Sequence, residues 1–232
     1  MDDLAPEYVA ARRVLLDALV ALDGHVDNLV LVGAQAVYHH TESADLNVPL
    51  MTTDADLAVN TREFANVPEI GGVLRAAGFT PGPNPGHWVS VSDVAVDLMV
   101  VPHQAGTTNA SARAARIAPH EKLTARIARG LEPALLDNEI VTIAALEPGD
   151  ARTCDMRVAG PAALLTAKAI KIGERLEQAD RQPDRLKEKD ALDAFRLTPQ
   201  GRLAQLAAAA SQDDQTVAPA FSALVNELLA AL

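Results

Sequence analysis

One run of eight residues constrains the fold of this chain more than any other stretch: residues 94–101, VAVDLMVV. Seven of the eight are apolar, and a continuous apolar run of this length predicts a strand buried in a sheet. Asp97 lies in its middle. A carboxylate buried without a partner is strongly disfavoured, so this position calls for a metal ion, a basic partner or a functional proton. Pairing with an arginine such as Arg126, or a place at a strand end in water, are the alternatives.

A second acidic feature is PLMTTDADLAVN, residues 49–60, where Asp54 and Asp56 are one residue apart in a predicted strand. Strand side chains alternate between faces, so these two carboxylates point the same way and repel each other. If this strand lies beside residues 94–101, three carboxylates converge on one patch. Hard oxygen ligands of this kind favour Mg²⁺. The alternative is a solvated strand end with a turn-forming aspartate.

A glycine separates a predicted strand from a predicted helix in NLVLVGAQAV. Residues 29–32 are continuously apolar, Gly33 follows, and helix-permissive residues come next. A glycine at this junction lets backbone N–H groups and the helix N-terminus approach an anion such as phosphate. The chain has no P-loop and no G-x-G-x-x-G motif, which disfavours ordinary NTPase and dinucleotide folds.

The order of periodic segments predicts an α/β or α+β fold, with a small mixed sheet, flanking helices and a helical C-terminal part. We expect a domain with the sheet over residues 1–158 and a helical domain over residues 159–232. The expected helices cover residues 5–22, part of 64–79, 161–177, 186–197, 200–210 and 218–231. The expected strands are 29–32, the stretch around Asp54 and Asp56, two strands within 87–101, and weaker candidates at 139–145 and 153–158.

Composition narrows the class of protein. The net charge is −11, and aromatic residues make up 3% of the 232 residues, which disfavours a broad nucleic-acid surface and base-stacking platforms. The single cysteine, Cys154, forms no internal disulfide. The acidic N-terminus and the lack of an apolar run near 18 residues predict a cytoplasmic protein without a membrane segment.

Two local clusters of cations stand out against this acidic background. Segment 111–130 offers a candidate patch for an anionic acceptor, with Arg113, Arg116, Lys122, Arg126 and Arg129 against Glu121. On the predicted helix 161–177, a basic stripe runs beside an apolar stripe and consists of Lys168, Lys171 and Arg175. A solvated helix face is the alternative for this stripe. On the next predicted helix, Asp190 and Asp193 share one face, where we favour a structural role.

Taken in order, these features resemble the polymerase-β-like nucleotidyltransferase superfamily. The carrying residues are Gly33-Ala34 after a strand, then Thr53-Asp54-Ala55-Asp56-Leu57, then a hairpin ending in Val96-Asp97-Leu98. The segments LLTAKAIKIGER and RLKEKDALDAFRL are similar to the Lys…Arg…Lys-Asp-x-x-Asp pattern of AbiEii-type toxin nucleotidyltransferases and their MenT-like relatives. The resemblance covers roughly residues 25–197.

The resemblance implies a role for each matching residue. Asp54, Asp56 and Asp97 are the implied catalytic residues and ligands of Mg²⁺ or Mn²⁺, with Asp97 beside the attacking hydroxyl. The implied nucleotide-binding residues are Gly33, Ala34, Thr53, Lys168, Lys171 and Arg175. The family usually has Gly-Gly or Gly-Ser where this chain has Gly33-Ala34, so a hydroxyl contact to phosphate is missing.

The leading hypothesis is a Mg²⁺-dependent nucleotidyltransferase that moves a nucleoside monophosphate from an NTP to an acceptor hydroxyl. A tRNA 3′ end, a protein side chain or a small molecule fits as acceptor. The resemblance also implies a toxin role and an antitoxin partner. One alternative is a catalytically weakened binding or regulatory module, suggested by Ala34. Another is a nucleotide-sugar glycosyltransferase that uses the Asp-x-Asp motif, against which the fit of Asp97 counts.

Overall fold

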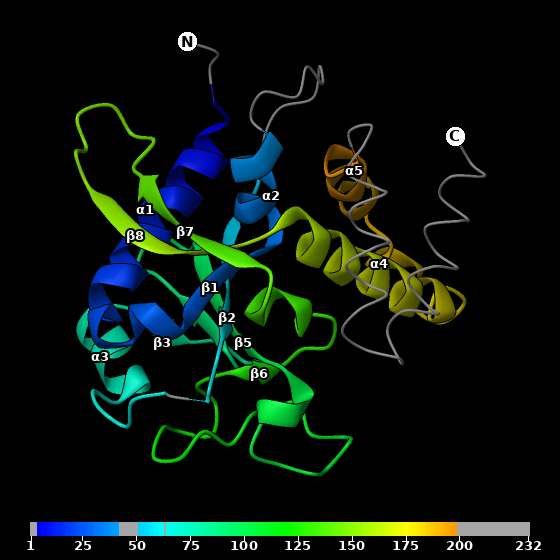
Figure 1. Cartoon of the computed structure of the whole chain (residues 1–232), viewed down its shortest axis with the longest axis horizontal. Coiled ribbons are helices and arrows are strands. Elements are labelled where there is room, and N and C mark those ends of the chain that lie inside the picture. Colours follow the sequence, from blue (N-terminus) through cyan, green and yellow to red (C-terminus); the bar gives the residue numbers. More distant parts are fainter. Residues whose placement is uncertain (1–3, 42–50, 63, 199–232) are drawn as a thin grey trace.

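The computed structural model describes residues 4–41, 51–62 and 64–198, and shows a mixed sheet with helices on both faces (Figure 1). This confirms the fold class expected from the sequence. The helices are α1 (Pro6–Ala21), α2 (Gly33–Thr41), α3 (Ile70–Ala76), α4 (Pro161–Glu177) and α5 (Glu188–Arg196). The strands are β1 (Leu29–Val32), β2 (Asp54–Val59), β3 (Thr80–Pro81), β4 (His87–Val89), β5 (Ala95–Val100), β6 (Arg126–Ile127), β7 (Asn138–Ala144) and β8 (Thr153–Ala159). Short 3₁₀ turns are η1 (Asp23–Asn28), η2 (Pro102–Gln104), η3 (Pro133–Leu135) and η4 (Pro183–Arg185).

The two acidic strands are neighbours in the centre of the sheet. The strand order is β3-β4-β5-β2-β1-β8-β7, and β6 pairs with β5. β2 runs parallel to β5 and antiparallel to β1. Leu31, Leu57 and Leu98 on these three strands are completely buried. The buried apolar residues of these strands therefore hold β2 and β5 side by side, so that the aspartates on the two strands are neighbours.

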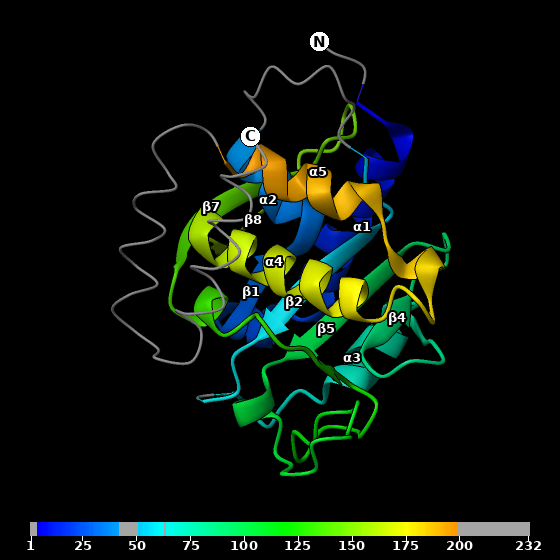
Figure 2. The same cartoon turned by 90° about the vertical axis from the view of Figure 1, so that its right-hand side faces the viewer.

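Helix α1 packs on one face of the sheet. It starts at Pro6, a residue suited to the first turn of a helix, and its buried residues recur at three- and four-residue steps, among them Leu15 and Leu19. Helix α4 crosses the opposite face in front of β1, β2 and β5, and α5 packs against it (Figure 2). Between α4 and the sheet lies the cleft described below.

The bounds of several elements in the structure agree closely with those expected from the sequence. Helix α4 has the bounds expected from the sequence, and α1, α5, β7 and β8 differ from expectation by at most two residues at either end. The two-residue strands β3 and β6 are too short to carry a periodic signal and were not expected. The predicted helices at 200–210 and 218–231 lie outside the described residues, and the division at residues 158 and 159 stays a prediction.

Within the described ranges, every helix is too short or too polar to cross a lipid bilayer.

Candidate active site

Asp54, Asp56 and Asp97, here called the three aspartates, lie on one face of the sheet. Asp56 and Asp97 are directly opposite each other in the parallel ladder of β2 and β5, and Asp54 faces Ala95 two positions earlier. Because side chains alternate along a strand, residues two apart and residues in register share a face. All three carboxylates line the same cleft.

The cleft has a volume of about 1160 Å³ and lies between the sheet and α4. Its cations outnumber its carboxylates in a chain that carries a net charge of −11. The lining cations are Arg113, Arg126, Arg129, Lys168, Lys171, Arg175 and Arg185, and the lining carboxylates are the three aspartates and Glu174. The lining identified in the described part of the chain contains no Phe, Tyr or Trp. The cleft therefore suits a phosphate-bearing ligand held by charge and hydrogen bonds.

Asp97 is held from two sides. His87 on β4, its partner in the strand register, places Nδ1 2.6 Å from Asp97 Oδ1. Arg126 on β6 donates from one guanidinium nitrogen to Asp97 Oδ2 at 3.3 Å, and the same nitrogen lies 3.9 Å from Asp56 Oδ1. The arginine partner that the sequence offered as an alternative is thus present alongside the other two carboxylates. Nothing in the sequence pattern singled out His87.

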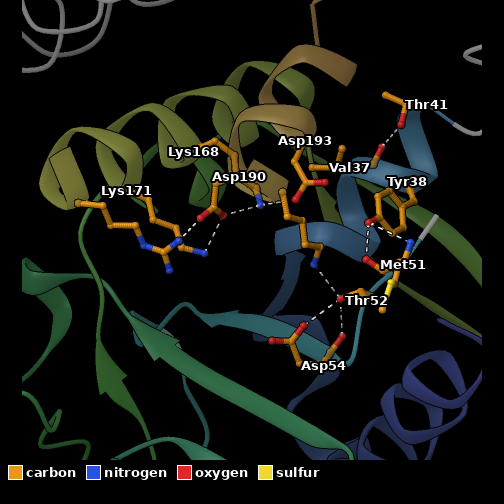
Figure 3. A network of polar contacts seen from close by, with 12 residues as sticks. Val37, Tyr38, Thr41, Met51, Thr52, Asp54, Lys168, Lys171, Asp190 and Asp193 are labelled. Atoms are coloured by element: carbon orange, nitrogen blue, oxygen red, sulfur yellow. Dashed lines mark hydrogen bonds and ion pairs between the residues drawn. The ribbon is translucent and has the colours of Figure 1, made fainter. Parts of the chain in front are cut away.

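Asp54 is oriented by Thr52 rather than by Thr53. The buried Thr52 hydroxyl donates to Asp54 Oδ1 at 2.9 Å (Figure 3), while Thr53, the residue implied by the resemblance, is exposed. Lys189 on α5 in turn donates to the Thr52 hydroxyl at 3.4 Å. A chain of polar contacts therefore connects α5 with the carboxylate of Asp54.

We expect Thr52→Val to weaken Mn²⁺ binding about 10- to 100-fold, the usual effect of losing a hydrogen bond that orients a metal ligand. Thr53→Val is the matched control and should leave Mn²⁺ affinity unchanged. Thr52→Ser keeps the hydroxyl and should bind Mn²⁺ as tightly as wild type. Calorimetric titration of Mn²⁺ into the three variants measures this. Equal effects of the two valine substitutions would contradict the assignment of Thr52.

The side chain of Asp56 lies in close contact with Gly33 at the start of α2. Gly33 has φ +68°, and a Cβ on it would lie 2.7 Å from Asp56 Cγ and closer still to Oδ2. Burial, together with the negative charges of Asp54 and Asp97, raises the pKa of Asp56 from 3.8 to about 6. Ala34, the next residue, is buried at 4% exposure and packs in the core. At this junction Gly33, and not the side chain of Ala34, faces the cleft.

The basic stripe of α4 is held by carboxylates of α5 (Figure 3). Lys168 is buried, with Nζ 2.5 Å from Asp193 and 3.5 Å from Asp190. Asp190 also pairs with Lys171 at 3.0 Å and with Arg175. Asp190 and Asp193 thus have the structural contacts across helices that the sequence suggested. Lys171 is exposed, so it is better placed than Lys168 to meet a ligand in the cleft.

The donor set fits a hard divalent cation. Three carboxylates share one face, and two of them already share the cation Arg126. The pKa of Asp56 is raised mainly by burial and, in addition, by the negative charges of Asp54 and Asp97. Across residues 4–41, 51–62 and 64–198, however, no three acidic, histidine or cysteine side chains are spaced as a ready-made metal cage. The residue types suit Mg²⁺, while their present positions are set by Thr52, His87 and Arg126.

Comparison with known proteins gives the family. No curated protein matches the chain significantly. A family model described as Nucleotidyltransferase matches residues 13–211, a range that includes the three aspartates, Gly33 and the helices α4 and α5. Such enzymes transfer nucleotidyl groups and use an NTP as substrate. Since the match spans well over half of the chain, this protein belongs to that nucleotidyltransferase family.

Proposed function

We propose that the protein is a Mg²⁺-dependent enzyme that transfers a nucleoside monophosphate from an NTP to an acceptor hydroxyl. The observation that carries the proposal is the placement of the three aspartates on one wall of a cleft whose opposite wall, α4, presents cations. The negative aspartates would hold the metal ions, and the positive side chains of α4 would contact the phosphates of the NTP.

The three aspartates would hold the cation, which would neutralise charge on the phosphates and on the leaving pyrophosphate. Lys171 and Arg175 bind phosphate oxygens, and the N-terminus of α2 at Gly33 offers backbone N–H groups to them. The acceptor oxygen bonds to the α-phosphorus, the bridging bond to the β-phosphate breaks, and pyrophosphate leaves. The hydroxyl proton passes to Asp97, the carboxylate that His87 orients.

The acceptor would approach from the side of Asp97. Arg113 and Arg129 also line the cleft, and the Arg113 carbonyl accepts from the N–H of Ile127 on β6, the neighbour of β5. Both lie within the segment 111–130, the candidate patch for an anionic acceptor. We propose a tRNA 3′ end or a protein side chain as acceptor, in the cytoplasm. A toxin role with an antitoxin partner rests on the resemblance to AbiEii-type enzymes.

The second candidate is a catalytically weakened nucleotide-binding module. It rests on Ala34, which replaces the glycine or serine usual in the family and buries its side chain in the core. In that protein the cleft would still bind an NTP with its cation, while transfer would be absent.

Thermal unfolding with millimolar Mg²⁺ and each of the four NTPs tests both candidates. A ligand that binds only the native state at about 100 times its Kd stabilises it by about 2.7 kcal/mol, so the melting temperature should rise by several degrees. In parallel, transfer of label from α-³²P-NTP to components of a cell extract should occur. A thermal shift without transfer would favour the weakened module, and no shift with any NTP would contradict both candidates.

A further inference from the structure

Arg126 occupies the place between two of the three aspartates. Its guanidinium nitrogen Nη2 lies 3.3 Å from Asp97 Oδ2 and 3.9 Å from Asp56 Oδ1. The residue is fixed at its backbone, because β6 pairs with β5 and places Arg126 beside Met99 in the parallel ladder. Its side chain is half-buried and lines the cleft. A unit positive charge thus already stands where a cation would be bound.

The carboxylate oxygens are arranged for this guanidinium rather than for a metal ion. Within the described residues no three acidic or imidazole groups have the spacing of a metal cage, and Arg126 contacts Asp56 and Asp97 at the same time. A divalent ion bound to these oxygens would lie within a few ångströms of the guanidinium, where the two cations repel each other strongly. The ion and Arg126 in its present position therefore exclude each other.

We propose that Arg126 is an exchangeable internal cation: it holds Asp56 and Asp97 together in the ion-free protein, gives way when the metal binds, and then contacts the phosphates of the NTP. This proposal rests on the metal-dependent reaction proposed above. The guanidinium is suited to the second contact because its planar fork pairs with phosphate as well as with carboxylate. Its Nε is buried and has no hydrogen-bond partner among the described residues, so a donor remains to be used after the exchange.

Arg126→Gln should change the affinities for Mn²⁺ and for an NTP analogue in opposite directions. Without nucleotide, the variant should bind Mn²⁺ about tenfold more tightly than wild type, because the competing charge is gone. With saturating Mn²⁺, it should bind an α,β-methylene NTP analogue about tenfold more weakly, because a charge-assisted phosphate contact is lost. A side chain that only maintained the fold would weaken both ligands together.

Mn²⁺ binding is measured from the electron paramagnetic resonance signal of the free ion, and analogue binding by calorimetry at saturating Mn²⁺. Arg129→Gln is the matched control, because it removes the same charge from the same cleft. None of the ion pairs within the described part of the chain includes Arg129. It should change Mn²⁺ affinity far less. Arg126→Lys, which retains the charge, should stay close to wild type for Mn²⁺ and guards against a folding defect in the glutamine variant.

Unchanged or weaker Mn²⁺ binding by Arg126→Gln, an equal gain in Arg129→Gln, or unchanged analogue binding would each overturn the exchange. If the proposed metal-dependent function itself is wrong, the result is a different one. Wild type would then bind Mn²⁺ no better than Asp56→Asn, whatever residue is at position 126.

Discussion

The Asp56→Asn variant should lose nucleotidyl transfer by more than about a hundredfold, and in the absence of metal ions it should be more stable than wild type. The loss of transfer follows from removing a charge that holds the cation while retaining the size of the side chain. The gain in stability follows from the burial of the Asp56 charge and from its repulsion by Asp54 and Asp97, both of which the neutral amide removes. Transfer from α-³²P-NTP and thermal unfolding in EDTA measure the two effects.

The pH dependence of the stability gain has a defined sign. Folding raises the pKa of Asp56 from 3.8 to about 6, so ionising this group destabilises the ion-free folded protein by at most about 3 kcal/mol at neutral pH. Because 20% of the side chain is still exposed, we expect about 1 to 2 kcal/mol. The penalty is absent below the unfolded pKa, grows as the pH rises towards 6, and is constant above it.

Wild type and Asp56→Asn should therefore unfold alike near about pH 4 and differ fully near about pH 7.5. Asp180→Asn, which changes an exposed aspartate outside the cleft, is the matched control and should show no such gap. If Asp56→Asn retains wild-type transfer, the metal-dependent mechanism is wrong. If the variant is less stable than wild type at neutral pH, then burial and the neighbouring aspartates do not disfavour the ionised carboxylate of Asp56.

Gly33→Ala should be the second severe substitution, with a loss of about 3 kcal/mol or more in the free energy of unfolding. Two effects add up. The backbone at φ +68° disfavours any residue with a Cβ, and the new methyl group would overlap the carboxylate of Asp56. To make room, the carboxylate of Asp56 must move away from Gly33, which disturbs its position relative to Asp54 and Asp97, so Mn²⁺ binding should weaken at least about tenfold as well.

Gly149→Ala separates the two effects. Gly149 has φ +85°, and a Cβ there would meet nothing within 4 Å, so this control carries the backbone strain without the clash. It should reduce stability by about 1 kcal/mol and leave Mn²⁺ binding unchanged. Chemical denaturation compares the two alanine variants. Equal losses of stability would show that Asp56 can adapt and that Gly33 matters only for its backbone.

The sequence predicted what depends on periodicity. The spacing of Asp54 and Asp56 placed both on one face, and the apolar run around Asp97 identified a buried strand. That the two acidic strands are neighbours was a condition that the sequence left open. The glycine after residues 29–32 marked a strand that leads directly into a helix. These inferences need only the period of a strand and the rules for helix starts.

The rest depended on side-chain directions at the ends of strands and on contacts between segments far apart in the chain, which periodicity does not encode. Choosing Thr52 over Thr53 as the partner of Asp54 needs the direction of each side chain at a strand entrance. Arg126 enters the site from β6, a strand of two residues. Lys168 was expected to meet phosphate, yet its helix turns it into a buried pair with Asp193, so its nucleotide-binding role stays a prediction.

The close contact between Gly33 and the carboxylate at position 56 also links the two positions in evolution. A relative that has lost catalysis and carries a small residue at position 56 would have space for a side chain at position 33, while an active relative would not. A glycine at position 33 is therefore favoured both by its backbone conformation and by the carboxylate beside it, and the second reason links changes at the two positions across the family.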